Sequence, residues 1–187
     1  TNTYPDSTYS ARAYFLMGRA FHGLNQYQEA AEAFSTYMKR VPGVLDGYVH
    51  EYQGDALHEA KDYTGAQNAY NAALSAPRLD DGEDLQMKIA GTRADFGDYA
   101  GALVLYDQII STTTNDYVKA QMEYLAGNAH IALGQTDLAY ERYQNAVNNY
   151  PLSYYAYLSL LALVDAGVEV EELNRGLVDY YNDQYDV

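Results

Sequence analysis

Residues 120–151 read AQMEYLAGNAHIALGQTDLAYERYQNAVNNYP, and this stretch decides the fold. Small and apolar residues recur in it at spacings of three and four, which is the period of one face of a helix. Gly134 separates two such segments, because glycine readily ends a helix, and Pro151 prevents the second segment from continuing. The stretch therefore predicts two helices joined by a tight turn.

The same pattern of small and aromatic residues occurs four times along the chain. Its central small residue lies 36, 36 and 37 residues from the next copy, at Gly18, Gly54, Ala90 and Gly127. An aromatic residue, an alanine and a second aromatic residue follow at constant offsets, as in Tyr63, Ala66 and Tyr70 of the second copy. The small residues allow the two helices to pack closely, and the large rings fill the space between neighbouring pairs.

This pattern resembles the tetratricopeptide repeat, a two-helix unit that stacks in series. The resemblance implies an all-α fold, namely a right-handed superhelical solenoid of antiparallel helix pairs with about ten helices. We expect one solenoid over residues 1–187. Its units span residues 11–44, 47–80, 83–116 and 120–151, followed by an extra helix over 152–166 and a partial unit over 169–187.

The two ends of the chain suggest a longer array. Tyr4–Pro5 is typical of the end of a preceding second helix, and Leu173, Gly176, Tyr180 and Tyr185 repeat the spacing of a first helix. We therefore expect an excised segment, the alternative being a complete protein with frayed ends. The extra helix over 152–166 is apolar nearly all round, so it is expected to be buried on every side.

The composition restricts the classes of function. With 26 acidic and 11 basic residues, the formal charge is −15 and the pI is near 4.3. Nucleic acids and anionic membrane surfaces attract Lys and Arg, so binding to either is not expected. No apolar run is long enough to span a bilayer, so membrane insertion is not expected either. A cationic peptide or a neutral sugar polymer is compatible, and solubility alone also explains the acidic excess. The chain has no cysteine, which excludes disulfides and thiolate chemistry.

The resemblance to the tetratricopeptide repeat implies that ligands bind to a concave groove, which is built from the first helix of each repeat. Counted from the central small residue, the groove positions are −6, −3, +1 and +4. They give the candidate ligand-binding residues Arg12, Phe15, Arg19, His22, Tyr48, Glu51, Asp55, His58, Met87, Tyr124 and Asn128. Aromatic and hydrogen-bonding groups alternate in this set, which suits an extended peptide or a glycan. The carboxylate clamp found in some members of the family is not expected, because Phe15 and Glu51 stand where it requires lysine.

Two groups within this set have competing interpretations. Polar side chains lie along one side of the expected helix in the second repeat, namely Glu51, Asp55, His58 and Glu59. They form a site for a divalent cation, a solvated acidic ridge, or ion pairs with Arg12 and Arg19 of the neighbouring repeat. His22 and His58 hold equivalent places, which suggests either a shared ligand or general-base role, or simple repetition.

The sequence contains no recognisable catalytic motif. We find no Gly-x-Ser-x-Gly, no phosphate-binding glycine loop and no His-Glu-x-x-His, so the chain is expected to be no enzyme and to hold no cofactor or metal. An acidic run falls at an expected helix start, where carboxylates favour the positive end of the helix dipole: Asp80, Asp81, Glu83 and Asp84. Helix capping therefore explains this run, which also lacks the spacing of a calcium loop.

A second, weaker resemblance concerns the cell envelope. Residues 150–157, YPLSYYAY, are similar to segments of the α-superhelical region of bacterial soluble lytic transglycosylases, in which helical repeats precede a peptidoglycan-cleaving domain. The Glu-Ser pair of that catalytic domain does not occur in this chain. The 36-residue spacing with Tyr-Pro endings also resembles periplasmic repeat lipoproteins, and both resemblances imply an extracytoplasmic location.

These observations predict a non-catalytic protein-interaction scaffold that binds a peptide or a partner protein. The alternative is the non-catalytic superhelical domain of a lytic transglycosylase, in contact with peptidoglycan fragments. The sequence leaves the oligomeric state open, with end-to-end contacts between copies as one option.

Overall fold

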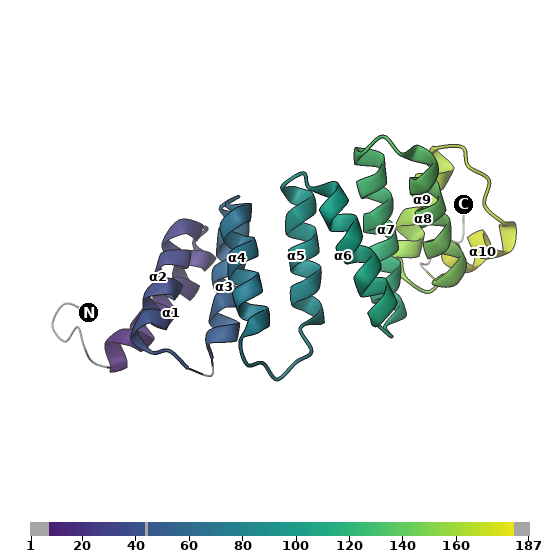
Figure 1. Cartoon of the computed structure of the whole chain (residues 1–187). Coiled ribbons are helices and arrows are strands. Elements are labelled where there is room, and N and C mark those ends of the chain that lie inside the picture. Colours follow the sequence, from purple (N-terminus) through teal and green to yellow (C-terminus); the bar gives the residue numbers. More distant parts are fainter. Residues whose placement is uncertain (1–7, 44, 182–187) are drawn as a thin grey trace. The chain divides into compact units, whose positions relative to one another are not determined.

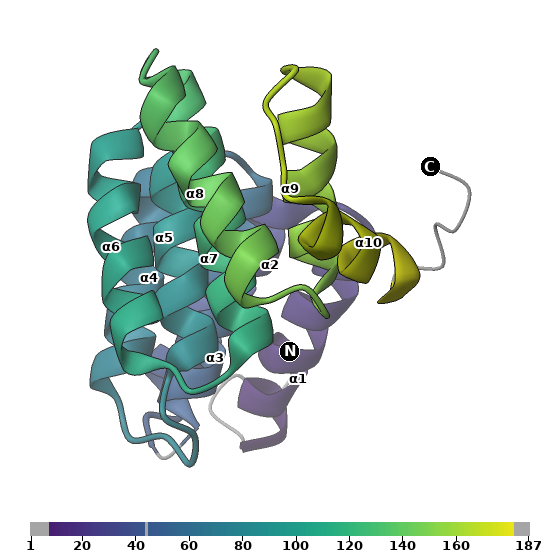
Figure 2. The same cartoon turned by 90° about the vertical axis from the view of Figure 1, so that its right-hand side faces the viewer.

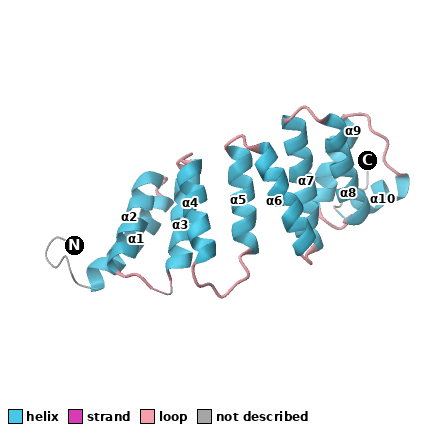
Figure 3. Cartoon of the chain, in the orientation of Figure 1, coloured by secondary structure: helices cyan, strands magenta, loops and turns pink. Residues whose placement is uncertain are grey.

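The computed structural model describes residues 8–43 and 45–181, and every regular element in these ranges is a helix (Figure 3). The all-α prediction is confirmed. The sequence features at Tyr4–Pro5 and Tyr185 lie outside the described residues. Among the described helices, none has the length and apolarity that crossing a bilayer requires. The chain divides into two compact units, Thr1–Phe96 and Gly97–Val187, and each is described by itself.

The first unit consists of two helix pairs and one further helix (Figure 1). Its helices are α1 (Thr8–Gly23), α2 (Tyr27–Arg40), α3 (Asp46–Glu59), α4 (Tyr63–Ser75) and α5 (Glu83–Asp95). α1 packs on α2, α3 packs on α2 and α4, and α5 packs on α4. The two pairs coincide with the predicted repeats over 11–44 and 47–80, and α2 ends two residues before Pro42, as the sequence predicts.

The second unit contains the remaining described helices, namely α6 (Tyr99–Thr112), α7 (Asp116–Ala132), α8 (Thr136–Asn149), α9 (Tyr154–Asp165) and α10 (Glu172–Tyr181). α7 pairs with α8, α6 packs on α7, and α9 packs on both α7 and α8. α10 lies against α8 and α9 (Figure 2). The predicted repeat over 83–116 therefore contributes α5 to the first unit and α6 to the second.

The central small residues lie where the two helices of a pair approach most closely. A Cβ atom on Gly18 would lie 2.6 Å from the ring of Phe34, and one on Gly54 would lie 2.5 Å from the ring of Tyr70. A Cβ atom on Gly127 would likewise clash with the ring of Tyr143 on α8. No side chain fits at such separations without displacing the ring, so glycine is required at these three positions, whereas the third repeat has Ala90 at the equivalent place.

The turn inside each repeat uses left-handed backbone at one fixed place, seven residues after the central small residue. Gly97 and Gly134 have φ values of 89° and 72°, which agrees with their predicted role in ending the first helix. The first two repeats place Asn25 (φ 59°) and Lys61 (φ 62°) at this position. Lysine has no side-chain chemistry that favours this conformation, so Lys61 costs the fold some stability.

The prediction that the extra helix is buried on every side is wrong. α9 buries Ala156, Leu160 and Leu163 in a core that also contains Val178 of α10. Its opposite side is open to solvent, since Tyr154, Leu161 and Val164 are exposed. α9 ends just before Gly167, which has a φ of 71° like the turn residues of the repeats. α9 therefore behaves as the first helix of a fifth pair, with α10 packed on it.

Candidate protein-interaction surface

The candidate residues of the first repeat lie along α1 and remain accessible to solvent. Arg12 and Arg19 are exposed, whereas Phe15 and His22 are half-buried. Phe15 contacts the ring of Tyr52 on α3 at a centroid distance of 5.9 Å, and the guanidinium of Arg19 lies 4.6 Å from the centroid of the same ring. Tyr52 thus links two neighbouring first helices, and it is absent from the residues that the sequence singled out.

Glu51 and Asp55 of α3 share one cation, Lys88 of α5. The Lys88 Nζ lies 2.9 Å from Glu51 Oε1 and 2.7 Å from Asp55 Oδ1. The other oxygen of Glu51 accepts a hydrogen bond from Arg78 at 3.0 Å. Burial alone would raise the pKa of Glu51, but the hydrogen bonds and charges of Lys88 and Arg78 outweigh burial and lower this pKa. Both carboxylates are therefore partners of Lys88 in a network that joins α3 to α5.

This network differs from the ion pairs that the sequence suggested. Among the described residues, neither Arg12 nor Arg19 pairs with Glu51 or Asp55. Arg19 lies over the ring of Tyr52 instead. The cations that pair with the acidic side of α3 are Arg78 of the α4–α5 connection and Lys88 of α5. In residues 8–43 and 45–181, no group of three or more His, Asp or Glu side chains is arranged to hold a metal ion. The acidic side of α3 therefore serves as an ion-paired seam between repeats.

Two candidate residues accept hydrogen bonds from the tyrosine of their own repeat. The Tyr70 hydroxyl donates to Asp55 Oδ1 at 2.8 Å, and the Tyr143 hydroxyl donates to Asn128 Oδ1 at 2.7 Å. Burial, together with neighbouring tyrosines, raises the pKa of Tyr143 to about 12. The first repeat has a phenylalanine at the tyrosine position and Arg19 at the acceptor position. Asp55 and Asn128 thus satisfy an internal hydroxyl group.

The two equivalent histidines repeat one local contact. His22 packs edge-to-face on Tyr27, and His58 packs in the same way on Tyr63, with centroid distances of 5.4 and 5.5 Å. His58 also lies within hydrogen-bonding distance of Asp95, with 2.8 Å between Nε2 and Oδ2. Each imidazole therefore braces the turn between the two helices of its repeat, so repetition accounts for their equivalent positions.

The remaining candidates lie on α5 and α7. Met87 is half-buried on α5. Tyr124 of α7 is half-buried and contacts the rings of Tyr143 and Tyr155 at centroid distances of 6.0 and 5.8 Å. Tyr155 also touches Tyr117, whose side chain is exposed. Tyr124 thus belongs to a row of tyrosines that runs from α7 to α9 within the second unit.

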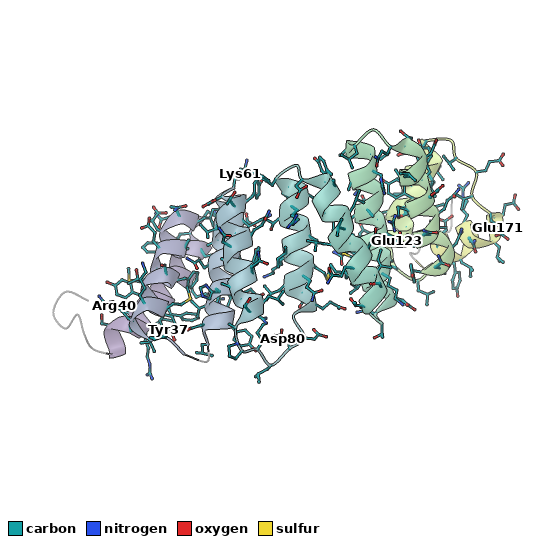
Figure 4. The ribbon with its side chains drawn as sticks, in the orientation of Figure 1. Tyr37, Arg40, Lys61, Asp80, Glu123 and Glu171 are labelled. Carbon is teal, nitrogen blue, oxygen red and sulfur yellow. The ribbon has the colours of Figure 1, made fainter. Side chains whose placement is uncertain are left out.

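A pocket of about 420 Å³ opens in the first unit where α3 meets the α4–α5 connection and the start of α5. We call it the α3–α5 pocket, and it is lined by Tyr48, Glu51, Tyr52, Arg78, Asp80, Asp81, Glu83 and Asp84. Asp80 marks its position on the connection in Figure 4. The guanidinium of Arg78 lies 4.8 Å from the centroid of the Tyr48 ring, and the Tyr48 hydroxyl accepts a hydrogen bond from the Leu79 N–H at 3.1 Å.

Sequence reasoning named Tyr48 and Glu51 of this pocket and missed Arg78. One signal was present in the sequence, because Arg78 is the only basic residue between Lys61 and Lys88. Glu83 and Asp84 lie in the first turn of α5, as the helix-start interpretation predicts, whereas Asp80 and Asp81 precede the N-cap residue Gly82, and α5 has no side-chain cap hydrogen bond. Asp80 accepts a hydrogen bond from the Gly82 N–H at 3.1 Å, and Asp81 accepts one from the backbone of the next helix residue at 3.2 Å. All four carboxylates of the run also line the pocket.

The second unit has a less polar pocket of about 410 Å³ between the start of α7, the α8–α9 connection and α10. It is lined by Asp116, Tyr117, Asn149, Tyr150, Pro151, Leu152, Ser153 and Leu177. Tyr117 and Leu152 remain exposed at its edge. Both units therefore carry an accessible hollow beside a first helix.

Comparison with known proteins identifies the helix pairs. A family model described as tetratricopeptide repeat matches residues 12–43 and 122–153, which correspond to the first and fourth predicted repeats. These two segments are tetratricopeptide repeats. Three further features agree with this assignment. Four copies of the pattern follow one another at 36 or 37 residues, a glycine faces the second-helix ring in the first, second and fourth copies, and a residue with positive φ follows seven positions after each central small residue.

Solved structures share the tetratricopeptide-repeat fold of this chain. One crystal structure of MamA has 15% sequence identity and a TM-score of 0.61, covering 79% of this chain and 82% of MamA. A second crystal structure of MamA protein has 18% identity and the same TM-score, covering 94% of this chain and 87% of that chain. A comparison with curated proteins found no match. None of these findings supports the weaker resemblance to lytic transglycosylases.

Proposed function

We propose that this chain is a non-catalytic scaffold that binds a partner protein through the accessible side chains of its first helices. Tetratricopeptide repeats bind protein partners, and one observation supports the same role here. All eleven candidate positions on the first helices are exposed or half-buried, whereas the central glycines and second-helix rings opposite them are buried. Helix packing thus buries one set of side chains and leaves the other set at least partly accessible to a ligand.

The accessible set suits a peptide segment of a protein better than a small molecule. It combines aromatic rings, such as Tyr48 and Tyr124, with charged and amide side chains, and this mixture is typical of protein interfaces. The α3–α5 pocket and the pocket beside α7 are open hollows on the surfaces of their units. An extended peptide presents side chains that fill such hollows in succession. The extracytoplasmic location stays a prediction from the sequence.

A peptide-display selection on the immobilised full chain tests this function. Enriched peptides are synthesised, and hydroxyl-radical footprinting compares side-chain labelling of the chain with and without each peptide. We expect protection of the first-helix residues Tyr48, Met87 or Tyr124, with unchanged labelling of Leu74 and Leu138, which are exposed on second helices. Failure to enrich any binding peptide, or protection confined to Leu74 and Leu138, would contradict the proposal.

A further inference from the structure

We propose that the α3–α5 pocket receives a guanidinium or ammonium side chain from a positively charged segment of the partner protein. This inference rests on the proposed scaffold function and names the chemistry of the partner. Three features of the first unit support it: the charge of the pocket walls, the position of two arginines of the chain itself, and the volume of the hollow.

The walls of the pocket carry an excess of negative charge. Five carboxylates face one guanidinium, that of Arg78. Arg78 pairs with Glu51 at 3.0 Å and with Asp80 at 2.8 Å, so these two carboxylates already have a cation. Among the described residues, no Lys or Arg forms an ion pair with the other three: Asp81, Glu83 and Asp84. A cation entering the pocket would therefore meet carboxylates that still lack one.

The environment of Arg78 shows that these walls accommodate a cation away from water. Only 9% of its side chain is exposed, and its guanidinium is held by two carboxylates while it lies over the ring of Tyr48. Carboxylates supply charge-assisted hydrogen bonds, and the face of an aromatic ring attracts a cation. Arg19 lies over the other tyrosine of the pocket, Tyr52. Both tyrosines of the pocket thus already attract an arginine of the chain itself.

Other occupants fit this pocket less well. An anion or an anionic lipid would be repelled by the net charge of the walls, and the chain as a whole carries −15. Hydrogen bonds to the backbone at the start of α5 explain why Asp80 and Asp81 stand before this helix, but these bonds do not require the hollow of about 420 Å³ beside them. This volume falls within the range of ligand pockets and exceeds what a single water occupies. The walls are also too polar for a purely apolar side chain.

Isothermal titration calorimetry with two matched peptides tests the proposal. The probe is a short Gly/Ser peptide that carries two arginines, and its control is the same peptide with citrulline, which keeps the shape and removes the charge. We expect the arginine peptide to bind at least about tenfold more tightly, the factor that corresponds to one charge-assisted contact. The difference should shrink when the salt concentration is raised, because salt screens exposed charges.

Matched variants locate the binding. Asp81→Asn with Asp84→Asn removes two pocket charges, and Glu29→Gln with Glu32→Gln removes two exposed charges on α2. We expect about tenfold weaker binding of the arginine peptide to the first variant and little change for the second. Should circular dichroism show that the first variant is unfolded, Asp84→Asn alone provides the comparison, because the Asp84 side chain has no hydrogen-bond partner among the described residues, unlike Asp81.

Three results would overturn the inference. Equal affinity for the arginine and citrulline peptides would show that charge does not decide binding. Equal loss in the two variants would show attraction to the net charge of the chain and not to the pocket. Enrichment of neutral display peptides that protect first-helix residues, without binding of the arginine peptide, would refute this inference and leave the scaffold function standing.

Discussion

Replacing Lys88 with methionine tests whether the ion-paired seam holds α3 against α5. Methionine keeps most of the length and volume of the side chain and removes its charge. The variant leaves Asp55 with the Tyr70 hydroxyl as its remaining partner and leaves Glu51 with Arg78. Two charge-assisted hydrogen bonds, of 2.7 and 2.9 Å, are lost together with one charge.

The expected loss of stability lies between two known limits. Exposed ion pairs contribute about 0–1 kcal/mol, whereas removing one partner of a fully buried pair costs about 3–5 kcal/mol. The Lys88 side chain is 34% exposed and each carboxylate keeps a second partner, so we expect Lys88→Met to cost about 1–2 kcal/mol. For a chain of this length, this corresponds to a melting temperature lower by roughly 2–8 °C.

The effect should depend on pH in a defined direction. The pKa of Glu51 in the folded chain is lowered, so its stabilising contribution is present above its ordinary pKa of 4.5 and is lost as the pH falls through the folded-state value. Burial alone would lower the pKa of Lys88, but its hydrogen bonds to Asp55 and Glu51 raise it. The contribution of Lys88 is therefore complete below its ordinary pKa of 10.5 and is lost as the pH rises through the folded-state value. The difference between wild type and variant should be largest near neutral pH.

Urea unfolding followed by far-ultraviolet circular dichroism measures the loss, and native-state hydrogen exchange locates it. Amides of α3 and α5 should lose protection, whereas those of α8 should not. Lys119→Met is the matched control, because its partner Asp116 is 73% exposed, and it should change stability by no more than about 0.5 kcal/mol. Equal effects of the two substitutions, or a Lys88→Met effect that persists unchanged at pH 3, would refute the reasoning.

Three further predictions concern packing, a buried charge and a turn. Gly127→Ala should destabilise the chain by about 1–3 kcal/mol because its methyl group meets a tyrosine ring, while Gly91→Ala, with open space around it, should be neutral or stabilising by thermal denaturation. Arg142→Met should cost about 3 kcal/mol in urea unfolding, because it leaves Glu123 buried without its cation, and adding Glu123→Gln should restore part of the loss. Lys61→Gly should raise the free energy of unfolding by about 0.5–1 kcal/mol, since glycine adopts a positive φ without strain; an unchanged melting temperature would contradict this.

The pairing of helices was predictable from the sequence because each contact is local to a repeat. The close approach of Gly54 to Tyr70 and the turn at Gly134 each depend on residues within one repeat, and four copies repeat the same spacing. The burial of α9 was not predictable in the same way. Its residues are apolar on all sides, so the sequence carries no period that tells which side faces α8 and which side, with Leu161 and Val164, faces solvent.

The site was only partly predictable, because its cations come from outside the positions that define the repeat. Counting along first helices found Tyr48 and Glu51, but Arg78 lies on a connection whose course the repeat pattern does not specify. Lys88 was missed for a similar reason, since its partners belong to another repeat. Phe15 packs against three aromatic rings, so substituting it by alanine would reduce stability as well as any ligand binding.

Equivalent positions have different roles in different repeats, because the second-helix ring determines what the neighbouring first helix must provide. A buried tyrosine hydroxyl needs an acceptor, and Asp55 and Asn128 supply it in the second and fourth repeats. Phe34 makes no such demand in the first repeat, so Arg19 is free to lie over a tyrosine of the next helix instead. A ligand surface in such an array is therefore found by first removing the positions that satisfy internal groups. In the first unit, the carboxylates of Asp81, Glu83 and Asp84 at the start of α5 are among those that no second-helix hydroxyl requires, so they are available to a partner.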